Sequence, residues 1–233
     1  MEDQDKGLLA FSFANYANDF DRHIRDSIRG YGDLLSDVVL MSDYFVEDNS
    51  AVLDIGCSTG NFLATIKARN EARCPGARFI GLDVEPEFSS AWEAMKDDNI
   101  HFLVSDIRNF AIPESCSFVT SIFSLQFISE KDRRDILHRL FDAINPGGAL
   151  VIAEKVFVEN SKIHDIVASL HYEFKRRGFS EAEIAKKAQA LRSLMKPWTE
   201  SRLMDALGEA GFNRGNVQCF WRSHNFLALV ALR

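Results

Sequence analysis

The sequence predicts an α/β protein with a mostly parallel, Rossmann-like sheet of seven strands that ends in an antiparallel hairpin. Three observations indicate this fold. Short apolar runs alternate with amphipathic helical patterns over residues 51–154, which is typical of a parallel sheet with right-handed crossovers and helices on both faces. Two of these runs end in an acid, Asp54 and Asp83, and a glycine-rich turn follows the first. Two further apolar runs, 216–221 and 225–232, close the chain.

The N-terminal stretch, residues 8–45, is predicted to be helical, with aromatic residues such as Tyr16 and Phe20 on one side. Gly30 is expected to break this helix, because glycine is a weak helix former. An aromatic helix of this kind either packs against the core or closes over a bound ligand. We expect residues 1–45 to be a helical cover over the site, with Tyr16 as a candidate substrate contact.

The central region is predicted to alternate strands and helices. Residues 118–123 carry apolar and small polar side chains only, which is typical of a fully buried strand. The sequence Asn145-Pro146-Gly147-Gly148 is expected to stop the helix before it. In chain order we expect strand 51–55, helix 59–72, strand 78–83, helix 86–97, strand 100–104, strand 118–123, helix 130–144 and strand 149–154.

The alternation of predicted strands and helices stops after Phe157. Two charged amphipathic helices, 160–177 and 180–195, follow each other with no strand between them. We expect residues 158–198 to be a helical insertion over the carboxyl edge of the sheet, where ligands bind in such folds. A helix over 200–210 and the terminal hairpin, connected by Arg222-Ser223-His224, complete a single domain of 233 residues.

Composition limits the function classes. Hydrophobic residues make up 46% of the chain and the net charge is −7. Duplex or tRNA binding usually needs a basic stripe, and the densest basic stretch, 175–177 with Lys186 and Lys187 after it, is better explained as a solvated helix face. The apolar runs are too short to span a bilayer, and the N-terminus lacks a signal-peptide pattern. We therefore expect a cytoplasmic protein with no nucleic-acid or membrane partner.

The cysteines give no sign of a metal site. The sequence has four of them, with no Cys-x-x-Cys pair and no histidine pair nearby, so neither zinc nor a disulfide framework is indicated. Cys57 lies in the glycine-rich turn, where it is better explained as a small packing residue than as a nucleophile, because no base is placed beside it.

The turn after the first strand carries the strongest functional motif, Asp54-Ile55-Gly56-Cys57-Ser58-Thr59-Gly60. Its spacing differs from the Gly-x-Gly-x-x-Gly of dinucleotide folds and from the phosphate-binding P-loop. It matches the first motif of class I S-adenosylmethionine (SAM)-dependent methyltransferases. Asp83 is predicted to accept hydrogen bonds from both ribose hydroxyls, as acids at the end of the second strand do in nucleoside-binding folds, and Asp106 follows a third strand.

Nearly the whole chain after about residue 20 resembles the carboxy-S-adenosylmethionine synthase family, which supplies carboxymethyl groups for wobble-uridine modification in tRNA. The matching stretches are 29–31, 54–58, 106–108, 124–127, 140–151, 154–155, 171–176, 178–181, 210–212 and 229–232. The resemblance implies a seven-stranded class I methyltransferase fold, SAM as cofactor, and cofactor contacts from Tyr31, Gly56, Cys57, Ser58, Asp83, Asp106 and Ile107. We add to this predicted cofactor site the adjoining residues Asp54, Gly60, Val84 and Phe123.

Two positions depart from the family pattern. The family has an asparagine at Ile122, where it helps to hold the cofactor, and an arginine at Ala188, where it pairs with the extra carboxylate of carboxy-SAM. A carboxylate without a counter-charge in a partly dry site is costly, and of the neighbouring side chains Arg192, one helical turn onward, is the best substitute. These two changes argue against the family's own reaction.

We therefore expect first a SAM-dependent methyltransferase that acts on a small-molecule acceptor. The alternatives are a carboxy-SAM synthase that uses SAM and prephenate, and a non-catalytic SAM-binding protein. The sequence leaves room for a homodimer. Candidate catalytic residues are His171 and Tyr172, which lie in the insertion. Candidate substrate contacts are Tyr16, Gln126, Trp198 and Trp221.

Overall fold

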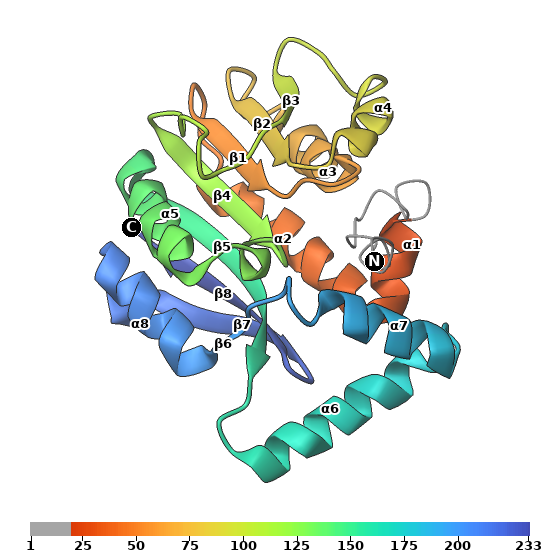
Figure 1. Cartoon of the computed structure of the whole chain (residues 1–233). Coiled ribbons are helices and arrows are strands. Elements are labelled where there is room, and N and C mark those ends of the chain that lie inside the picture. Colours follow the sequence, from red (N-terminus) through yellow and green to blue (C-terminus); the bar gives the residue numbers. More distant parts are fainter. Residues whose placement is uncertain (1–19) are drawn as a thin grey trace, which may run out of the picture.

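The computed structural model describes residues 20–233, and its centre is one twisted sheet with strand order β3-β2-β1-β4-β5-β8-β7 (Figure 1). The pairs from β3 to β5 are parallel, and β8 is antiparallel to both β5 and β7. The strands are β1 (Ala51–Ile55), β2 (Arg78–Asp83), β3 (Ile100–Val104), β4 (Cys116–Ile122), β5 (Ile144–Phe157), β7 (Val217–Ser223) and β8 (Phe226–Leu232). This confirms the predicted α/β class and the late antiparallel hairpin.

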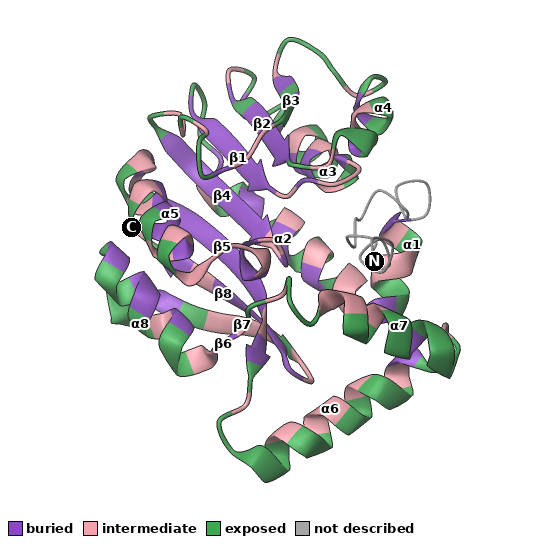
Figure 2. Ribbon diagram, in the orientation of Figure 1, coloured by how far each residue is buried: buried purple, intermediate pink, exposed green. Residues whose placement is uncertain are grey.

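Helices cover both faces of the sheet. One apolar core lies between the sheet and α5 and α8, and the other lies between the sheet and α2, α3 and α4. The central strands are buried on both faces (Figure 2), as expected for parallel strands without alternating polarity. The helices are α1 (Phe20–Ser27), α2 (Tyr31–Phe45), α3 (Asn61–Asn70), α4 (Ser89–Trp92), α5 (Glu130–Ala143), α6 (Ser161–Lys175), α7 (Glu181–Leu191) and α8 (Glu200–Ala210).

The helix predicted over 86–97 is shorter than expected and ends at Trp92. That stretch contains a 3₁₀ turn, Pro86–Phe88, and the four residues of α4. Trp92 is buried, stacks on Phe102 and donates its ring N–H to the Ser58 carbonyl at 2.8 Å, which fixes α4 against the glycine loop. The Asp97 side chain then accepts the backbone N–H groups of residues 99 and 100, and this local hydrogen bonding competes with a further helical turn.

Two other boundaries differ from the prediction. Residues 145–148 do not lie outside the sheet, because β5 already begins at Ile144, which pairs with Cys116. Phe123 does not continue β4. It has a φ of 58°, a left-handed conformation that turns the chain sharply at the carboxyl edge of the sheet.

The segment 158–198 forms α6, α7 and a two-residue strand, β6 (Trp198–Thr199), which pairs with β5. Side chains cap both helices. Asn160 caps α6, and Ser180 with Glu183 forms a capping box on α7. Only Lys175 is buried in α6 and only Ile184 in α7, and Figure 2 shows both helices as mostly exposed or half-exposed. No helix within residues 20–233 is long and apolar enough to cross a membrane.

Candidate functional site

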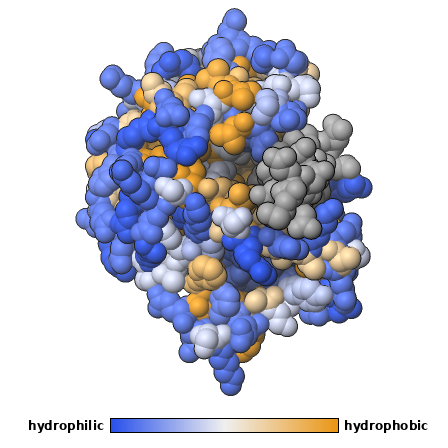
Figure 3. Space-filling view, in the orientation of Figure 1, coloured by the Kyte–Doolittle hydropathy of each residue, from blue (hydrophilic) through white to orange (hydrophobic). Residues whose placement is uncertain are grey.

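A large cavity of about 1720 Å³ opens at the carboxyl ends of β1, β2 and β4. Residues from α1, α2, α6 and α7 complete its walls. In Figure 3, apolar side chains gather around the central hollow of a surface that is otherwise mainly hydrophilic. The parallel β strands place the ends of several elements at one edge, so the cavity lies where the fold predicts a ligand.

The glycine loop after β1 turns tightly against β2. The backbone N–H groups of Gly56 and Cys57 both donate to the Leu82 carbonyl, at 2.7 and 2.9 Å. Gly56 has a φ of 78°, and a Cβ there would lie 2.0 Å from the Ser124 hydroxyl, so no larger residue fits. Helix α3 then begins after Gly60 without a side-chain cap, which leaves its first N–H groups for solvent or a ligand.

Asp83 is held by backbone amides at the end of β2. One carboxylate oxygen accepts the Ser58 N–H at 2.9 Å and the other accepts the Glu85 N–H at 3.0 Å. The side chain is only 8% exposed, and burial raises its pKa. Each carboxylate oxygen can accept a second hydrogen bond, so both oxygens remain able to accept hydrogen bonds from ligand hydroxyls. Val84 follows it and lines the same cavity.

Asp54 lines the cavity and is buried. The Thr120 hydroxyl donates to it at 2.7 Å, but burial outweighs that bond and raises the pKa of Asp54 to about 7. A positively charged ligand would therefore stabilise the ionised form of this carboxyl group.

Asp106 lines the cavity after β3 and is bound by its own loop. The backbone N–H of Arg108 donates to one carboxylate oxygen, and its guanidinium donates to the other, the shortest of these bonds being 2.5 Å. The guanidinium lowers the pKa of Asp106, so this acid is ionised. Ile107 is buried beside it. We call Asp54, Asp83 and Asp106 the acidic wall.

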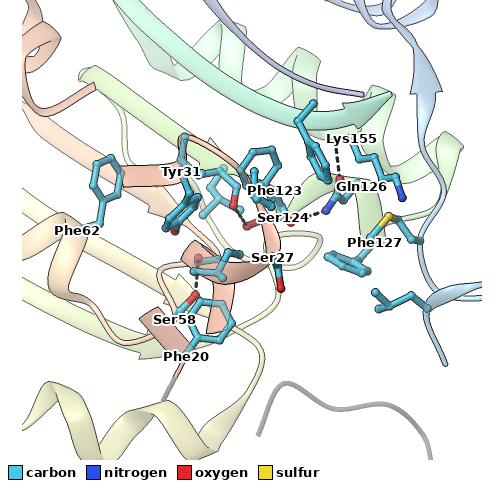
Figure 4. A pocket seen from close by; sticks show the side chains of 18 of the residues that line it. Phe20, Ser27, Tyr31, Ser58, Phe62, Phe123, Ser124, Gln126, Phe127 and Lys155 are labelled. Atoms are coloured by element: carbon cyan, nitrogen blue, oxygen red, sulfur yellow. Dashed lines mark hydrogen bonds between the residues drawn. The ribbon is translucent and has the colours of Figure 1, made fainter. Parts of the chain in front are cut away.

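Aromatic side chains form the next part of the lining. The rings of Tyr31 and Phe123 lie 6.1 Å apart, and Figure 4 shows them side by side in the pocket. Phe226 meets Phe123 edge-on at 5.5 Å. Trp221 packs behind Phe123 at 6.4 Å and is not among the residues that line the cavity. An apolar surface of this kind excludes water around a ligand.

The other predicted substrate residues are placed differently. Gln126 lines the cavity, but its side chain is occupied: it accepts the Lys155 N–H at 2.8 Å and donates to the Phe123 carbonyl at 3.1 Å (Figure 4). Trp198 is buried under the guanidinium of Arg133, 4.2 Å from the ring centre, away from the cavity lining. Tyr16 lies outside the described residues. Gly60 also does not line the cavity, although it starts α3.

The predicted catalytic pair, His171 and Tyr172, lines the cavity from α6. The Nδ1 atom of His171 is buried and has no hydrogen-bond partner in residues 20–233. Burial first, and then Lys155 and Lys175, lower the pKa of His171 to about 3. The ring is therefore neutral near pH 7 and a weak base, and it offers a neutral hydrogen-bonding group. Tyr172 is half-exposed at the rim.

Three lysines that were not among the predicted site residues line the same cavity as the acidic wall. Lys155 follows the buried part of β5, Lys175 ends α6, and Lys187 lies on α7. Burial lowers the pKa of all three, that of Lys187 to about 7. The prediction of a solvated helix face is thus wrong for Lys175 and Lys187, which the fold turns inward. We call these three residues the lysine wall.

A signal for Lys155 was present, because it lies at the carboxyl end of an apolar strand, as Asp54 and Asp83 do. No sequence pattern distinguished Lys175 and Lys187 from the exposed basic residues beside them, 176–177 and Lys186.

Helix α1 connects the two walls. Asp21 accepts hydrogen bonds from Thr59 at 3.1 Å and from Asn61 at 2.8 Å, which ties α1 to the glycine loop. On its other side, His23 bonds the Lys187 ammonium, and the Ser27 hydroxyl accepts from the same ammonium at 3.4 Å. The described part of the predicted N-terminal cover therefore lies over the cavity.

Comparison with known proteins identifies relatives over nearly the whole of this chain. A methyltransferase-domain family model matches residues 52–148. The carboxy-S-adenosyl-L-methionine synthase of Histophilus somni strain 2336 is 34% identical over 225 residues, covering 94% of this chain and 91% of the relative. The synthase of Staphylococcus epidermidis is 32% identical over 227 residues, covering 96% of each chain.

Solved structures show the same fold at lower identity. A SAM-dependent methyltransferase from Aquifex aeolicus superposes with a TM-score of 0.60 at 17% identity, over 95% of this chain and 98% of that one. The glycine loop, the uncapped start of α3 and the two buried acids at the ends of β1 and β2 fit a cationic nucleoside cofactor. The chain is therefore an enzyme that uses SAM, and it belongs to the carboxy-S-adenosyl-L-methionine synthase family.

Proposed function

We propose that this enzyme makes carboxy-SAM, by transferring a carboxyl group from a second substrate to the methyl group of SAM. The observation that carries this proposal is the identity of 32–34% to synthases of that name over nearly the whole chain. This promotes the second of our three sequence-based hypotheses over simple methyl transfer.

The size of the cavity supports a second substrate beside SAM. A volume of about 1720 Å³ exceeds the range of roughly 300–1000 Å³ that is usual for one small ligand. When bound, SAM supplies a methyl group activated by a positively charged sulfur. We propose that the acidic wall holds it: Asp83 accepts the ribose hydroxyls, Asp106 and Ile107 adjoin the adenine, and Asp54 lies toward the positive charge.

Prephenate, which the family resemblance implies, suits the role of carboxyl donor chemically. Its ring becomes aromatic when it loses the ring carboxyl group together with the ring hydroxide. The carboxyl group would replace one methyl hydrogen of SAM, and the released hydroxide would take up the displaced proton as water. The enzyme would then mainly have to align two ligands and exclude bulk water, which the aromatic lining and α1 favour.

The test is to incubate the enzyme with SAM and prephenate and to identify the products by mass spectrometry. We expect carboxy-SAM to form only when both substrates are present. Asp83→Ala should lower its yield, whereas Asp98→Ala, on the exposed turn before β3, should not. If S-adenosylhomocysteine accumulates instead with a metabolite extract, the methyl-transfer hypothesis is correct. If neither product forms, the chain is a SAM-binding protein without this chemistry.

Methyl transfer remains the second candidate because of two side chains. Ile122 and Ala188 both line the cavity, and neither can pair with the carboxylate of carboxy-SAM. Under that hypothesis SAM should bind more tightly than carboxy-SAM, and Ala188→Arg should shift the preference toward carboxy-SAM by about 2–5 kcal/mol if the site is dry. Arg192, one helical turn onward, also lines the cavity and is the candidate to take the place of the missing arginine. Competitive titration of the two sulfonium compounds measures this preference.

A homodimer and a cytoplasmic location stay predictions. The feature that favours a dimer is α6, on which Ile163, Ile166 and Leu170 are each about half exposed at helical spacing. Sedimentation of the parent chain and of Ile166→Lys tests the dimer, which the lysine should weaken. A monomeric parent chain would contradict it.

A further inference from the structure

The lysine wall is an accumulation of like charges. Lys155 lowers the pKa of Lys175, Lys175 lowers that of Lys187, and all three lower that of His171, so these groups lie within electrostatic reach of one another. Among residues 20–233, Lys155 and Lys175 have no hydrogen bond or ion pair to a carboxylate. Each instead lies near an aromatic ring, at 5.9 Å from Phe226 and 6.0 Å from Phe179.

Three acids that line the cavity are bound to other groups and form no ion pair with Lys155 or Lys175. Asp83 accepts backbone amides, Asp106 is paired with Arg108, and Asp21 is bonded to Thr59 and Asn61. Burying ammonium groups without a counter-charge destabilises a protein. A negatively charged ligand would supply the missing counter-charge and offset this cost.

Uncharged polar atoms beside the lysines also lack partners. Asn225 is 4% exposed and lines the cavity, and its side-chain oxygen has no hydrogen-bond partner in the described chain. The same holds for Nδ1 of His171, whose ring lies 5.1 Å from that of Phe226. Phe226 pairs with Lys155 across β5 and β8, so Phe226 forms the apolar floor between these groups. Buried polar atoms of native proteins normally have partners, and these open positions indicate a polar ligand.

We infer that Lys155 and Lys175, with Asn225 and the ring of His171 beside them, form a subsite that holds the carboxylate groups of the second substrate. The ammonium groups donate to carboxylate oxygens, and the Asn225 oxygen can accept a ligand hydroxyl. Lys187, held by His23 and Ser27, adds positive charge at the α1 side. The inference rests on the proposed function only in requiring a second ligand beside SAM.

The arrangement also separates the two ligands by charge. The acidic wall favours a cation and the lysine wall favours an anion, so each ligand is directed to its own side of the cavity. An uncharged acceptor would leave two ammonium groups desolvated and unpaired. The second substrate should therefore be an anion with at least one carboxylate, and a planar or ring-shaped apolar part would fit against Phe226.

Binding can be measured without any reaction. The full chain, saturated with S-adenosylhomocysteine, is titrated in a calorimeter with phenylsuccinate, a ring-bearing dicarboxylate, and with its uncharged diamide. We expect phenylsuccinate to bind and the diamide to bind at least 10-fold more weakly. Lys155→Met and Lys175→Met should each weaken phenylsuccinate binding by about 10-fold to 100-fold, the effect of losing a charge-assisted hydrogen bond. Lys186→Met and Lys162→Met, on the exposed faces of α7 and α6, should bind like the parent.

Thermal unfolding without ligand gives an independent readout. A lysine that serves only the fold should lower the melting temperature when it is replaced. A lysine kept for a ligand should raise the melting temperature when methionine removes its unpaired charge, while phenylsuccinate should no longer stabilise the variant. We expect the second pattern for Lys175→Met, the more buried of the two residues.

The inference is overturned if the parent chain binds neither compound, if the diamide binds as well as phenylsuccinate, or if the two lysine variants bind like the parent. These outcomes are distinct from failure of the proposed function. If phenylsuccinate binds in a lysine-dependent way but prephenate gives no carboxy-SAM, the subsite is supported and the proposed reaction is contradicted. If carboxy-SAM forms and neither lysine substitution affects its formation, the proposed reaction is supported and the subsite is contradicted.

Discussion

The acidic wall and the lysine wall face the same cavity but are built differently. Each acid is fixed by a bond within the protein: Asp54 by Thr120, Asp83 by two backbone amides and Asp106 by Arg108. Within residues 20–233, Lys155 and Lys175 have no bond to a carboxylate, and each lies about 6 Å from an aromatic ring. The acidic wall is therefore organised before a ligand arrives, whereas the lysine wall gains its counter-charge with the ligand.

The two walls also differ in their support. Two of the acidic wall's three acids, Asp54 and Asp83, lie at the ends of β1 and β2, in which every residue except Arg78 is buried. Two of the three lysines belong to α6 and α7, each of which buries a single residue. Elements with few buried contacts open at lower free-energy cost, so the lysine wall should be the part that moves when ligands enter.

The largest expected effect concerns the contact that attaches the insertion to the sheet. Arg133 is fully buried, donates to the carbonyls of Ile128 and Lys196, and lies 3.9 Å from the buried carboxyl group of Glu154. Arg133→Met should lower the free energy of unfolding by about 3–5 kcal/mol, because it leaves buried acceptors without a donor. Urea denaturation measures this.

The control is the same substitution at the neighbouring residue, Arg134. Arg134 pairs with Glu130 and Glu209 at the surface, and Arg134→Met should cost less than about 1 kcal/mol, as exposed ion pairs do. Equal losses in both variants would mean that the buried contact has no special role in holding the insertion.

The next effect tests the acidic wall. Asp83→Ala removes the acceptor proposed for the ribose hydroxyls and should weaken SAM binding by roughly 1–3 kcal/mol. Calorimetry measures the affinity, and phenylsuccinate binding to the lysine wall should change much less. Unchanged SAM affinity would remove Asp83 from the cofactor site.

A smaller effect should appear with pH. Because burial raises the pKa of Asp54 to about 7, this carboxyl group is partly protonated in the free protein, and a bound cation favours its ionised form. SAM affinity should therefore rise by up to about tenfold between pH 6 and pH 8, with proton release on binding near pH 7. In Asp54→Asn this dependence should disappear.

Asp54 should also affect stability with pH. Its folded pKa lies above the unfolded value of 3.8, so the folded state binds more protons between that value and about pH 7. The contribution of Asp54 to stability is thus full at low pH and is lost as pH rises through this range. A parent chain and an Asp54→Asn variant with parallel stability profiles would contradict the assignment.

The smallest expected effect is a difference in mobility between the walls. Limited proteolysis should cut residues 160–196 faster without ligands than with SAM and phenylsuccinate together, because ligand binding stabilises the closed form. The strands behind the acidic wall should resist in both states. Equal cutting of the insertion in both states would show that it is not a closing lid.

Local sequence patterns predicted the acidic wall well. Asp54 and Asp83 end apolar runs, and the parallel sheet brings the ends of such strands together. Prediction failed where contacts between distant residues decided the outcome. The helix expected over 86–97 ends early because Trp92 is fixed on Phe102 and because Asp97 bonds the following backbone. Trp198 and Trp221 are aromatic residues of the kind that often line a substrate pocket, but the fold packs them against Arg133 and Phe123.

The sheet, the glycine loop and the acids that follow the strands can be predicted from the sequence, because they depend on apolar periodicity and on residues close together in the chain. The lysine wall, in contrast, forms through long-range packing that no local sequence pattern predicts. Lys155, Lys175 and Lys187 come from three separate elements, and within α6 and α7 their pattern matches that of an ordinary solvated helix. They become cavity residues because the insertion folds back over the carboxyl edge of the sheet, and burial depends on that long-range packing rather than on the charge of any one residue.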